Sequence, residues 1–251
     1  MKSITTPVPA LDKVVRICDY LSQTQGATFT QIYQNVGIAK SSASSLLNGM
    51  LAHGLLRQDK DKFYLGLRLY ELGNKAAEQY DIKKIALPIL EEIRDSTGLT
   101  CHLGVLEGAA PIYLLKVESP QAIIIRSWEG KRLSLHSSGL GKVLIAWLAP
   151  EELDALLPSS QPLARYTPAT ITDIGQLKNE LAQIRARGWG YDNEEDSPGV
   201  RCIAVPVCNS RGNVVAALSV SGVTFQMPDD KRESLAQLMI DAGHKLSARL
   251  R

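Results

Sequence analysis

Cysteine is scarce in this chain of 251 residues, and long apolar runs are missing from it. Cys18, Cys101, Cys202 and Cys208 have no C-x-x-C spacing and stand in apolar surroundings, which argues against a zinc knuckle and against a disulfide framework. No stretch approaches the roughly 20 apolar residues of a membrane span, and the first ten residues lack the apolar core of a signal peptide. We therefore expect reduced thiols, no membrane association and a cytoplasmic location.

Histidine is also rare, which limits the chemistry the chain can perform. The four histidines are His53, His102, His136 and His244. An enzyme would need a nucleophile, a base and an orienting group, for instance Cys202 with His102 or His136 and Asp192. Cys202 lies in the apolar run CIAVPV, where a raised thiol pKa is expected. We expect no enzyme, no catalytic residue, no metal site and no cofactor.

Negative charge is absent from one segment, Gln31 to Gln58. A surface that faces phosphates requires such an absence. The first 75 residues carry nine Lys and Arg against five Asp and Glu, a net charge of +4, whereas the remainder carries 19 against 21, a net charge of −2. A basic small domain joined to a slightly acidic large one is typical of a DNA-binding head on a ligand-sensing body. Because the excess is modest, useful affinity requires a dimer.

The same segment has the pattern of a helix-turn-helix. Phe29, Ile32, Tyr33 and Val36 have helical spacing, Gly37 breaks the helix, and a second helix is expected from Ser41. After Gly54 the alternating run to Leu65 predicts a β-hairpin, the wing of a winged helix. The alternative is an ordinary α-hairpin packed on a sheet.

The outer face of the second helix is small, polar and uncharged, which suits a major groove about 12 Å wide. Asparagine can bond adenine there, and serine can bond bases or phosphates. The residues expected to contact DNA are Lys40, Ser41, Ser42, Ser44, Ser45 and Asn48 on this helix, with Arg57, Lys60 and Lys62 on the wing.

The rest of the chain predicts an α+β organisation. Helices are expected at 8–22, 67–79, 82–96, 139–149, 174–188 and 229–251, with Pro88 as a kink or an N-terminal boundary in the third of these. Strands are expected at 100–107, 111–119, 122–130, 201–209 and 214–223. Hairpins alternating with helices favour a sheet covered by helices over a doubly wound fold. We divide the chain into residues 1–66, a linker helix at 67–80, and residues 81–251.

Three segments of the larger part could hold a ligand. Ser138, Gly139 and Gly141 lead into a helix, whose free N–H groups could receive a carboxylate or could form a structural cap. Asp192 and Cys202 flank an acidic loop. Ser219 and Ser221 should point to the same side of one strand, where they either line a cavity or face water.

These motifs together resemble the IclR family of bacterial transcription regulators. The resemblance rests on FTQIYQNVGIAKSS, HGLL, YLGLRLYELG, HSSGLGKVLIAWL, GYDNEEDSPGVRCIAVPV and VVAALSVSG, in this order along essentially the full chain. It implies a winged helix-turn-helix, a linker helix and a GAF- or profilin-like effector-binding domain, assembled as homodimers or dimers of dimers on operator DNA. Within the family the chain is most similar to regulators of sugar-acid and related carboxylate catabolism, such as the 2-keto-3-deoxygluconate regulators.

The resemblance also implies where an effector binds. The family's pocket falls on Gly139, Leu140, Asp192, Cys202, Ser219 and Ser221, and a hydrophobic wall would come from 123–125, centred on Ile124. With Ser138 and Gly141 from the helix start, these are the expected effector contacts for a sugar acid or keto acid. One departure concerns Ser45, where relatives commonly have arginine. Lys40 and the basic wing must therefore supply more of the electrostatic attraction to DNA.

Two other functions remain open from the residues alone. One is a metabolite-binding protein that does not bind DNA, which would leave the basic wing unexplained. The other is a cysteine-dependent enzyme.

Overall fold

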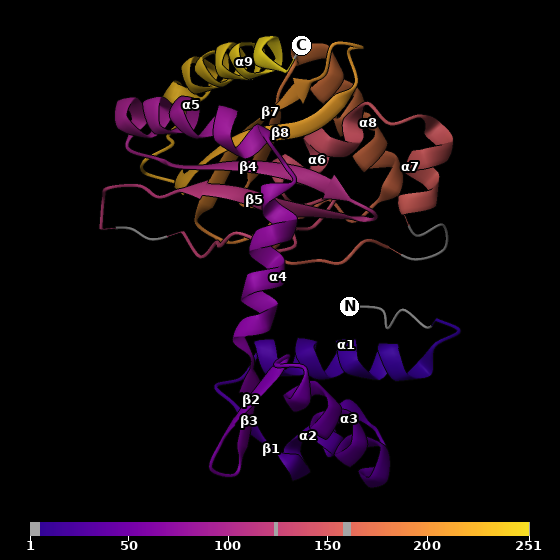
Figure 1. The fold of residues 1–251 in the computed structure, drawn as a ribbon. Coiled ribbons are helices and arrows are strands. Elements are labelled where there is room, and N and C mark those ends of the chain that lie inside the picture. The colour runs from indigo at the N-terminus through magenta and orange to yellow at the C-terminus, as the bar shows by residue number, and fades with distance from the viewer. Residues whose placement is uncertain (1–5, 123–124, 158–161, 251) are drawn as a thin grey trace. The chain divides into compact units, whose positions relative to one another are not determined.

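The computed structural model describes residues 6–122, 125–157 and 162–250. The chain divides into two compact units, Met1–Tyr80 and Asp81–Arg251, each with a sheet of its own (Figure 1). Ile124, expected in the hydrophobic wall, lies outside the described residues. Within the described ranges, no helix combines the length and the apolar character that crossing a membrane requires.

Three helices and a small antiparallel sheet form the body of the first unit. Helices α1 (Pro9–Ser22), α2 (Phe29–Val36) and α3 (Lys40–Ala52) precede the hairpin of β2 (Leu56–Asp59) and β3 (Lys62–Leu65). The expected helix-turn-helix and wing are confirmed. A short strand that the sequence did not predict, β1 (Ala27–Thr28), pairs with β3 and makes the sheet three-stranded.

Local contacts fix the turn between α2 and α3. The Thr28 hydroxyl accepts a hydrogen bond from the N–H of Gln31, and the Gln31 side chain accepts one from the N–H of Thr28, a reciprocal cap that starts α2. Gly37 ends α2 with a φ of 68°, in the left-handed region that glycine adopts without strain. The core beneath is formed by Ile17, Leu21, Ile32, Val36, Ala43, Leu47, Met50 and Phe63.

Helix α4 (Leu67–Glu78) follows the wing. None of its twelve residues, all of which the structure describes, is buried. Leu67 and Tyr70 are 81% and 69% exposed. The pairs Arg68–Glu71 and Lys75–Glu78 stabilise the helix weakly along its surface. This helix therefore keeps apolar side chains uncovered in the single chain.

The second unit is a five-stranded antiparallel sheet with helices on both faces (Figure 1). The sheet has the order β5-β4-β8-β7-β6, from β4 (Thr100–Glu107), β5 (Ala110–Val117), β6 (Gly190–Asn193), β7 (Val200–Cys208) and β8 (Val214–Val223). Helices α5 (Ile82–Thr97) and α9 (Arg232–Arg249), the latter after a 3-10 turn η1 (Asp229–Lys231), pack on one face. Helix α6 (Gly139–Ala146) covers the other with α7 (Pro150–Leu156) and α8 (Ile174–Arg187). The expected α+β architecture is confirmed.

The register of the sheet brings distant polar residues into one row. Asp192 on β6 pairs with Cys202 on β7, Cys202 pairs with Ser221 on β8, and Ser221 pairs with Thr100 on β4. Directly paired residues of antiparallel strands point to the same face. A polar row therefore crosses the sheet on the face that α6 covers.

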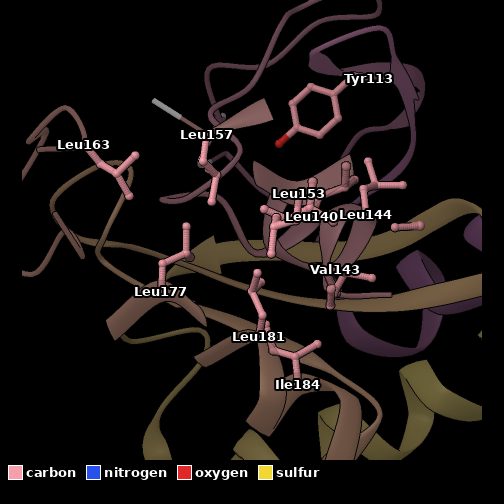
Figure 2. Packing of buried hydrophobic residues seen from close by; sticks show 14 residues of the cluster. Tyr113, Leu140, Val143, Leu144, Leu153, Leu157, Leu163, Leu177, Leu181 and Ile184 are labelled. Atoms are coloured by element: carbon pink, nitrogen blue, oxygen red, sulfur yellow. The ribbon is translucent and has the colours of Figure 1, made fainter. Parts of the chain in front are cut away.

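The layer of α6, α7 and α8 packs through leucine, isoleucine and valine side chains, shown in Figure 2. Leu140 lies over Gly104 on β4, where a Cβ atom would stand 2.5 Å from a Leu140 methyl group. The absence of a side chain at Gly104 lets α6 approach the sheet this closely. Helix α6 is thus fixed with its N-terminus at the polar row.

Several expected elements differ from the structure. The strand expected at 122–130 is wrong, because the described residues 125–130 contain no strand and Arg132 alone bridges to Ile112. Helix α5 continues through Pro88, so a boundary there is wrong. Helix α7 and strand β6 were not predicted, since both are short and neither has a clear periodicity.

Candidate functional site

Helix α3 presents its polar side chains to solvent along one face. Ala43, Leu47 and Met50 are buried at intervals of three or four residues, which turns the opposite face outward. The exposed residues of that face are Lys40, Ser41, Ser44, Ser45 and Asn48, and Ser42 is half-buried. Arg57, Lys60 and Lys62 are exposed on the wing of the same unit.

Two of the basic residues of the wing, Arg57 and Lys60, have different surroundings. The Arg57 guanidinium lies 4.2 Å from the centre of the Tyr64 ring, at paired positions of β2 and β3. The same ring rests against Gly26, where a Cβ would come within 2.4 Å of it. Lys60 stands at the tip with a φ of 55°, and its carbonyl accepts a hydrogen bond from the Gln58 side chain. Arg57 is therefore held against the sheet, whereas Lys60 marks the tip.

A shallow groove runs between α1 and the start of α3. Lys13 and Ala10 of α1 line it together with Ser41, Ser42 and Ser45. The sequence prediction did not include Lys13, because nothing in the periodicity of α1 shows that its polar side adjoins α3. Lys13 adds a positive charge beside a helix face on which Lys40 is the charged residue and the other exposed side chains are serine and asparagine.

A cavity of about 490 Å³ lies over the polar row of the second unit. Its lining comes from the sheet, the start of α6, the acidic loop and the segment 125–131, which we name the strap. The lining residues are Tyr113, Ile125, Arg126, Ser127, Trp128, Lys131, Ser138, Asp192, Asp196, Ser197, Val200, Cys202, Ser221 and Val223. The volume suits a small molecule.

One wall of the cavity consists of Asp192, Cys202 and Ser221. The Cys202 Sγ and Ser221 Oγ atoms are 3.0 Å apart, within hydrogen-bonding distance. Asp192 Oδ1 accepts hydrogen bonds from the N–H groups of Glu195 at 2.7 Å and Asp196 at 3.3 Å. Burial raises the pKa of Asp192 to about 7, although the hydrogen bond from Glu195 opposes that shift.

The start of α6 differs from the expectation of a free anion site. The Ser138 hydroxyl accepts a hydrogen bond from the N–H of Gly141 at 3.0 Å and donates one to the Ser134 carbonyl. A Cβ on Gly139 would lie 3.4 Å from backbone atoms of Asp192 and Cys202, and Leu140 belongs to the core. Ser138 lines the cavity, but Gly139, Leu140 and Gly141 are not among its lining residues, because helix packing and the cap occupy them.

Ser219 also differs from its predicted role. It is buried on the same side of β8 as Ser221, but it pairs with Ala204 and His102 in the next row of the sheet. That row is not part of the cavity lining. The alternation of side chains along a strand predicts which face of the sheet a residue lies on. It does not predict how far along the strand the cavity extends.

The strap supplies the cavity's cations, which the sequence prediction missed. Lys131 Nζ donates a hydrogen bond to the Arg126 carbonyl at 3.0 Å and lies 5.4 Å from the centre of the Trp128 ring. Arg126 and Lys131 line the cavity together with the carboxylates of Asp192 and Asp196. The sequence offered little signal, because Arg126 lies within the segment expected to be a strand and Lys131 directly follows it.

A buried ion pair fixes the acidic loop. Lys142 of α6 is fully buried, and its Nζ lies 2.6 Å from Glu195 Oε1. Thr170 donates a hydrogen bond to the Glu195 carbonyl, and Ser137 donates one to Asp196 Oδ1. The N–H of Glu195 donates a hydrogen bond to Asp192 in the cavity wall. The Lys142–Glu195 ion pair therefore helps to position Asp192 through the backbone of Glu195.

Neither His136 nor His102 is placed to act as a base for Cys202. Both ring nitrogens of His136 have other partners, Ser134 and the Ala164 carbonyl, and His102 Nε2 lies 2.8 Å from the Ser127 hydroxyl. Burial holds the pKa of Cys202 well above its ordinary value. Among the described residues, no three His, Cys, Asp or Glu side chains form a group that could hold a metal ion.

Comparison with protein families agrees with this geometry. A model of the IclR helix-turn-helix domain matches residues 10–60, and a model of the bacterial transcriptional regulator IclR C-terminal domain matches residues 74–248. The chain belongs to the IclR family. Members of this family are transcription regulators, so the enzyme hypothesis is set aside.

Individual IclR relatives align over nearly the full chain. RhmR, an uncharacterized HTH-type transcriptional regulator of Escherichia coli K12, is 39% identical over 97% of this chain and 94% of its own. The regulator KdgR of the same organism is 33% identical over 97% and 93%. The crystal structure of an IclR homolog from Microbacterium hydrocarbonoxydans, complexed with 4-hydroxybenzoate, superposes with a TM-score of 0.81 at 27% identity, over 96% of this chain and 99% of its own.

Proposed function

We propose that this IclR-family regulator binds operator DNA as a homodimer or dimer of dimers and responds to a small carboxylate, a sugar acid or keto acid, bound in the cavity of its second unit. The observation that carries the proposal is the joint presence of an exposed α3 face without acidic residues, a basic wing in the same unit, and a cavity lined by two cations in the other unit. Residues 1–66 would bind DNA in the cytoplasm, and residues 67–80 would form a helix that links them to the rest of the chain. Residues 81–251 would bind the effector and associate with the same domain of other copies.

The chemistry of the α3 face supports DNA reading. Ser41, Ser45 and Asn48 are exposed, carry no charge, and could reach base edges in a major groove. Lys60 and Lys62 on the wing and Lys13 beside α3 would bind phosphates, which position the protein without reading sequence. Few phosphate contacts per unit mean that one copy alone binds weakly.

Uncovered apolar side chains support association of two copies. Val8, Leu11 and Val15 of the first unit are 54%, 54% and 48% exposed, and their spacing places them on one stripe at α1. Leu67 and Tyr70 of α4 are more exposed still. A second copy of the chain would remove this apolar surface from water.

The charges of the cavity support an anionic effector. Lys131 and Arg126 would receive the carboxylate, and Ser221 and Asp192 would meet hydroxyl or keto groups. This assigns the anion to the strap instead of the capped start of α6. The bound 4-hydroxybenzoate of the Microbacterium protein is also a carboxylate, which favours this class of ligand.

A mobility-shift assay with the DNA upstream of the protein's own gene tests the DNA-binding half of the proposal. Wild type should shift this DNA in the presence of excess unrelated DNA, and Ser45→Glu, which places a negative charge on the α3 face, should not. Circular dichroism controls for folding. Equal shifts of upstream and unrelated DNA would contradict the assignment.

A thermal-shift series tests the effector half. Gluconate, 2-ketogluconate, pyruvate and 4-hydroxybenzoate would be compared with uncharged glucose. An acid present at 100 times its Kd should add about 2.7 kcal/mol to the free energy of unfolding. Lys131→Met should lose this stabilisation, while Lys178→Met, which removes an exposed lysine on α8, should keep it. Stabilisation by glucose and none of the acids would contradict an anionic effector.

A further inference from the structure

His102 lies directly behind two lining residues of the cavity. Its side chain, on the central part of β4, has no exposed surface. The imidazole stacks on the Tyr113 ring with 4.1 Å between centres, and its Nε2 lies 2.8 Å from the Ser127 hydroxyl. Tyr113 and Ser127 both line the cavity, whereas His102 does not. The imidazole therefore contacts two residues that line the cavity but does not line the cavity itself.

Among the described residues, the side chains of Lys116 and Lys131 also hydrogen-bond to backbone carbonyls in the first half of the strap. The Lys116 ammonium donates to the Ser127 carbonyl at 3.0 Å and, at 3.4 Å, to the carbonyl of Ile125. The second half pairs with β5 through backbone hydrogen bonds of Tyr113 with Gly130 and Lys131. Side chains of β4 and β5 thus anchor the part that precedes Trp128, where the described residues form no strand ladder.

The protonation of His102 can be assigned from its surroundings. Burial, together with the charges of Lys116 and Lys131, lowers the pKa of His102 to about 3, so the imidazole is neutral at physiological pH. The Ser127 hydroxyl has an acceptor of its own in the Ile125 carbonyl at 3.4 Å. Nδ1 is buried, and no described residue hydrogen-bonds to it. Because a buried N–H without a partner is rarer than an unpaired acceptor, we place the proton on Nε2.

We propose that His102 is a positioning residue of the effector cavity: its Nε2–H donates to Ser127 Oγ and thereby holds the strap that presents Arg126, Trp128 and Lys131. The inference rests on the proposed function for its meaning, because the strap carries the cations that would read the anion. A histidine suits the position since it is rigid, stacks on Tyr113 and places one donor at Ser127. The role is indirect, since His102 contacts the strap and not the ligand.

Amide hydrogen exchange in the full-length protein, without any effector, tests the proposal. Two substitutions form a matched pair: the amide nitrogen of His102→Gln reaches the position of Nε2, whereas that of His102→Asn is too short to reach Ser127. Peptides covering 125–131 should exchange roughly tenfold faster in His102→Asn and in Ser127→Ala, and close to the wild-type rate in His102→Gln. His136→Gln, which removes another largely buried imidazole, serves as the control and should leave the strap unchanged.

A double variant separates positioning from general packing. His102→Asn with Ser127→Ala should exchange no faster in the strap than either single variant, because both remove the same hydrogen bond. Faster exchange of equal size in the Gln and Asn variants, or additive effects in the double variant, would overturn the proposal.

Nitrogen NMR of the wild-type protein keeps the test open if the His102 variants do not fold. One of the four histidines should show the neutral Nε2–H form at every pH between 5 and 9, and its signal should change in Ser127→Ala. If the ring whose signal changes in Ser127→Ala titrates in this range, or carries its proton on Nδ1, the inference is contradicted. Hydrogen exchange and NMR are both measured without an effector, so their results do not depend on the effector assignment. If they contradicted the role of His102, the effector assignment would still stand.

Discussion

The two units use charge in opposite surroundings. In the first unit the basic residues of the wing and α3 are exposed, so they act on a partner through water and are screened by salt. In the second unit Asp192, Glu195 and His102 are buried, and burial shifts the pKa of each in favour of its neutral form, while Lys142 is buried in an ion pair with Glu195. Salt dependence should therefore belong to DNA binding, and pH dependence to the effector unit.

The largest expected effect comes from breaking the buried ion pair. Lys142→Met leaves Glu195 buried without its cation, which should lower the free energy of unfolding by about 3–5 kcal/mol. Adding Glu195→Gln should recover much of the loss. Tryptophan fluorescence during urea unfolding reports on the second unit alone, because Trp128, Trp147 and Trp189 all belong to it.

The counterpart in the first unit is the exposed pair Lys75–Glu78 on α4. Lys75→Met should leave the free energy of unfolding close to the wild-type value, measured by far-ultraviolet circular dichroism, because solvent screens an exposed pair. Similar losses for Lys142→Met and Lys75→Met would contradict the contrast between the units.

The pH dependence of stability isolates Asp192. Its pKa is raised from 3.8 to about 7 by burial, so the folded protein binds more protons than the unfolded chain between these values. The free energy of unfolding should fall as pH rises from about 4 to 7, with up to about 4 kcal/mol from this residue. Asp192→Asn keeps the acceptor for Glu195 and should flatten the profile. The free energy of unfolding would be measured at pH 5 and pH 7.5 for both proteins. If Asp192→Asn showed the same difference between the two pH values as wild type, the pKa of Asp192 would not be raised.

Base reading by α3 should have a smaller and local effect. Asn48→Ala should reduce discrimination at one base step by about 1–3 kcal/mol, because an amide can bond adenine at two positions. Anisotropy titrations against operators with single base changes measure this. Uniform weakening across all sequences would assign Asn48 to the backbone of the DNA instead.

The smallest effect is expected at the wing. Lys62→Ala should weaken binding to all sequences alike and reduce the slope of log K against log salt by about 1. Titrations between 50 and 200 mM salt measure the slope. A change in sequence preference without a change in slope would be the opposite result.

The two sites were not equally predictable from the sequence. The α3 face is a continuous stretch, so the spacing of Ala43, Leu47 and Met50 decided which side chains point outward. The cavity joins segments from Tyr113 to Val223. Motif residues such as Asp192 and Cys202 could be found through the family resemblance. Lys131 and Ser127 could not, because the strap is held by contacts with β4 and β5 and has no periodicity of its own.

The same reasoning explains why the structure makes the start of α6 a weaker candidate for the anion site than its sequence does. The start of α6 has the glycine-rich sequence of an anion-binding helix end, but Ser138 already caps the N–H of Gly141 and α6 packs against β6 and β7. Only the packed structure distinguishes an occupied helix end from a free one.

The most direct test of the account is the response of DNA affinity to the acid identified by thermal shift. Operator binding would be measured by anisotropy with and without that acid, for wild type, Lys131→Met and Lys178→Met. We expect wild type and Lys178→Met to change their DNA affinity by the same factor when the acid is added, and Lys131→Met to show no change at that concentration. An equal response in Lys131→Met would contradict an anion held by the strap.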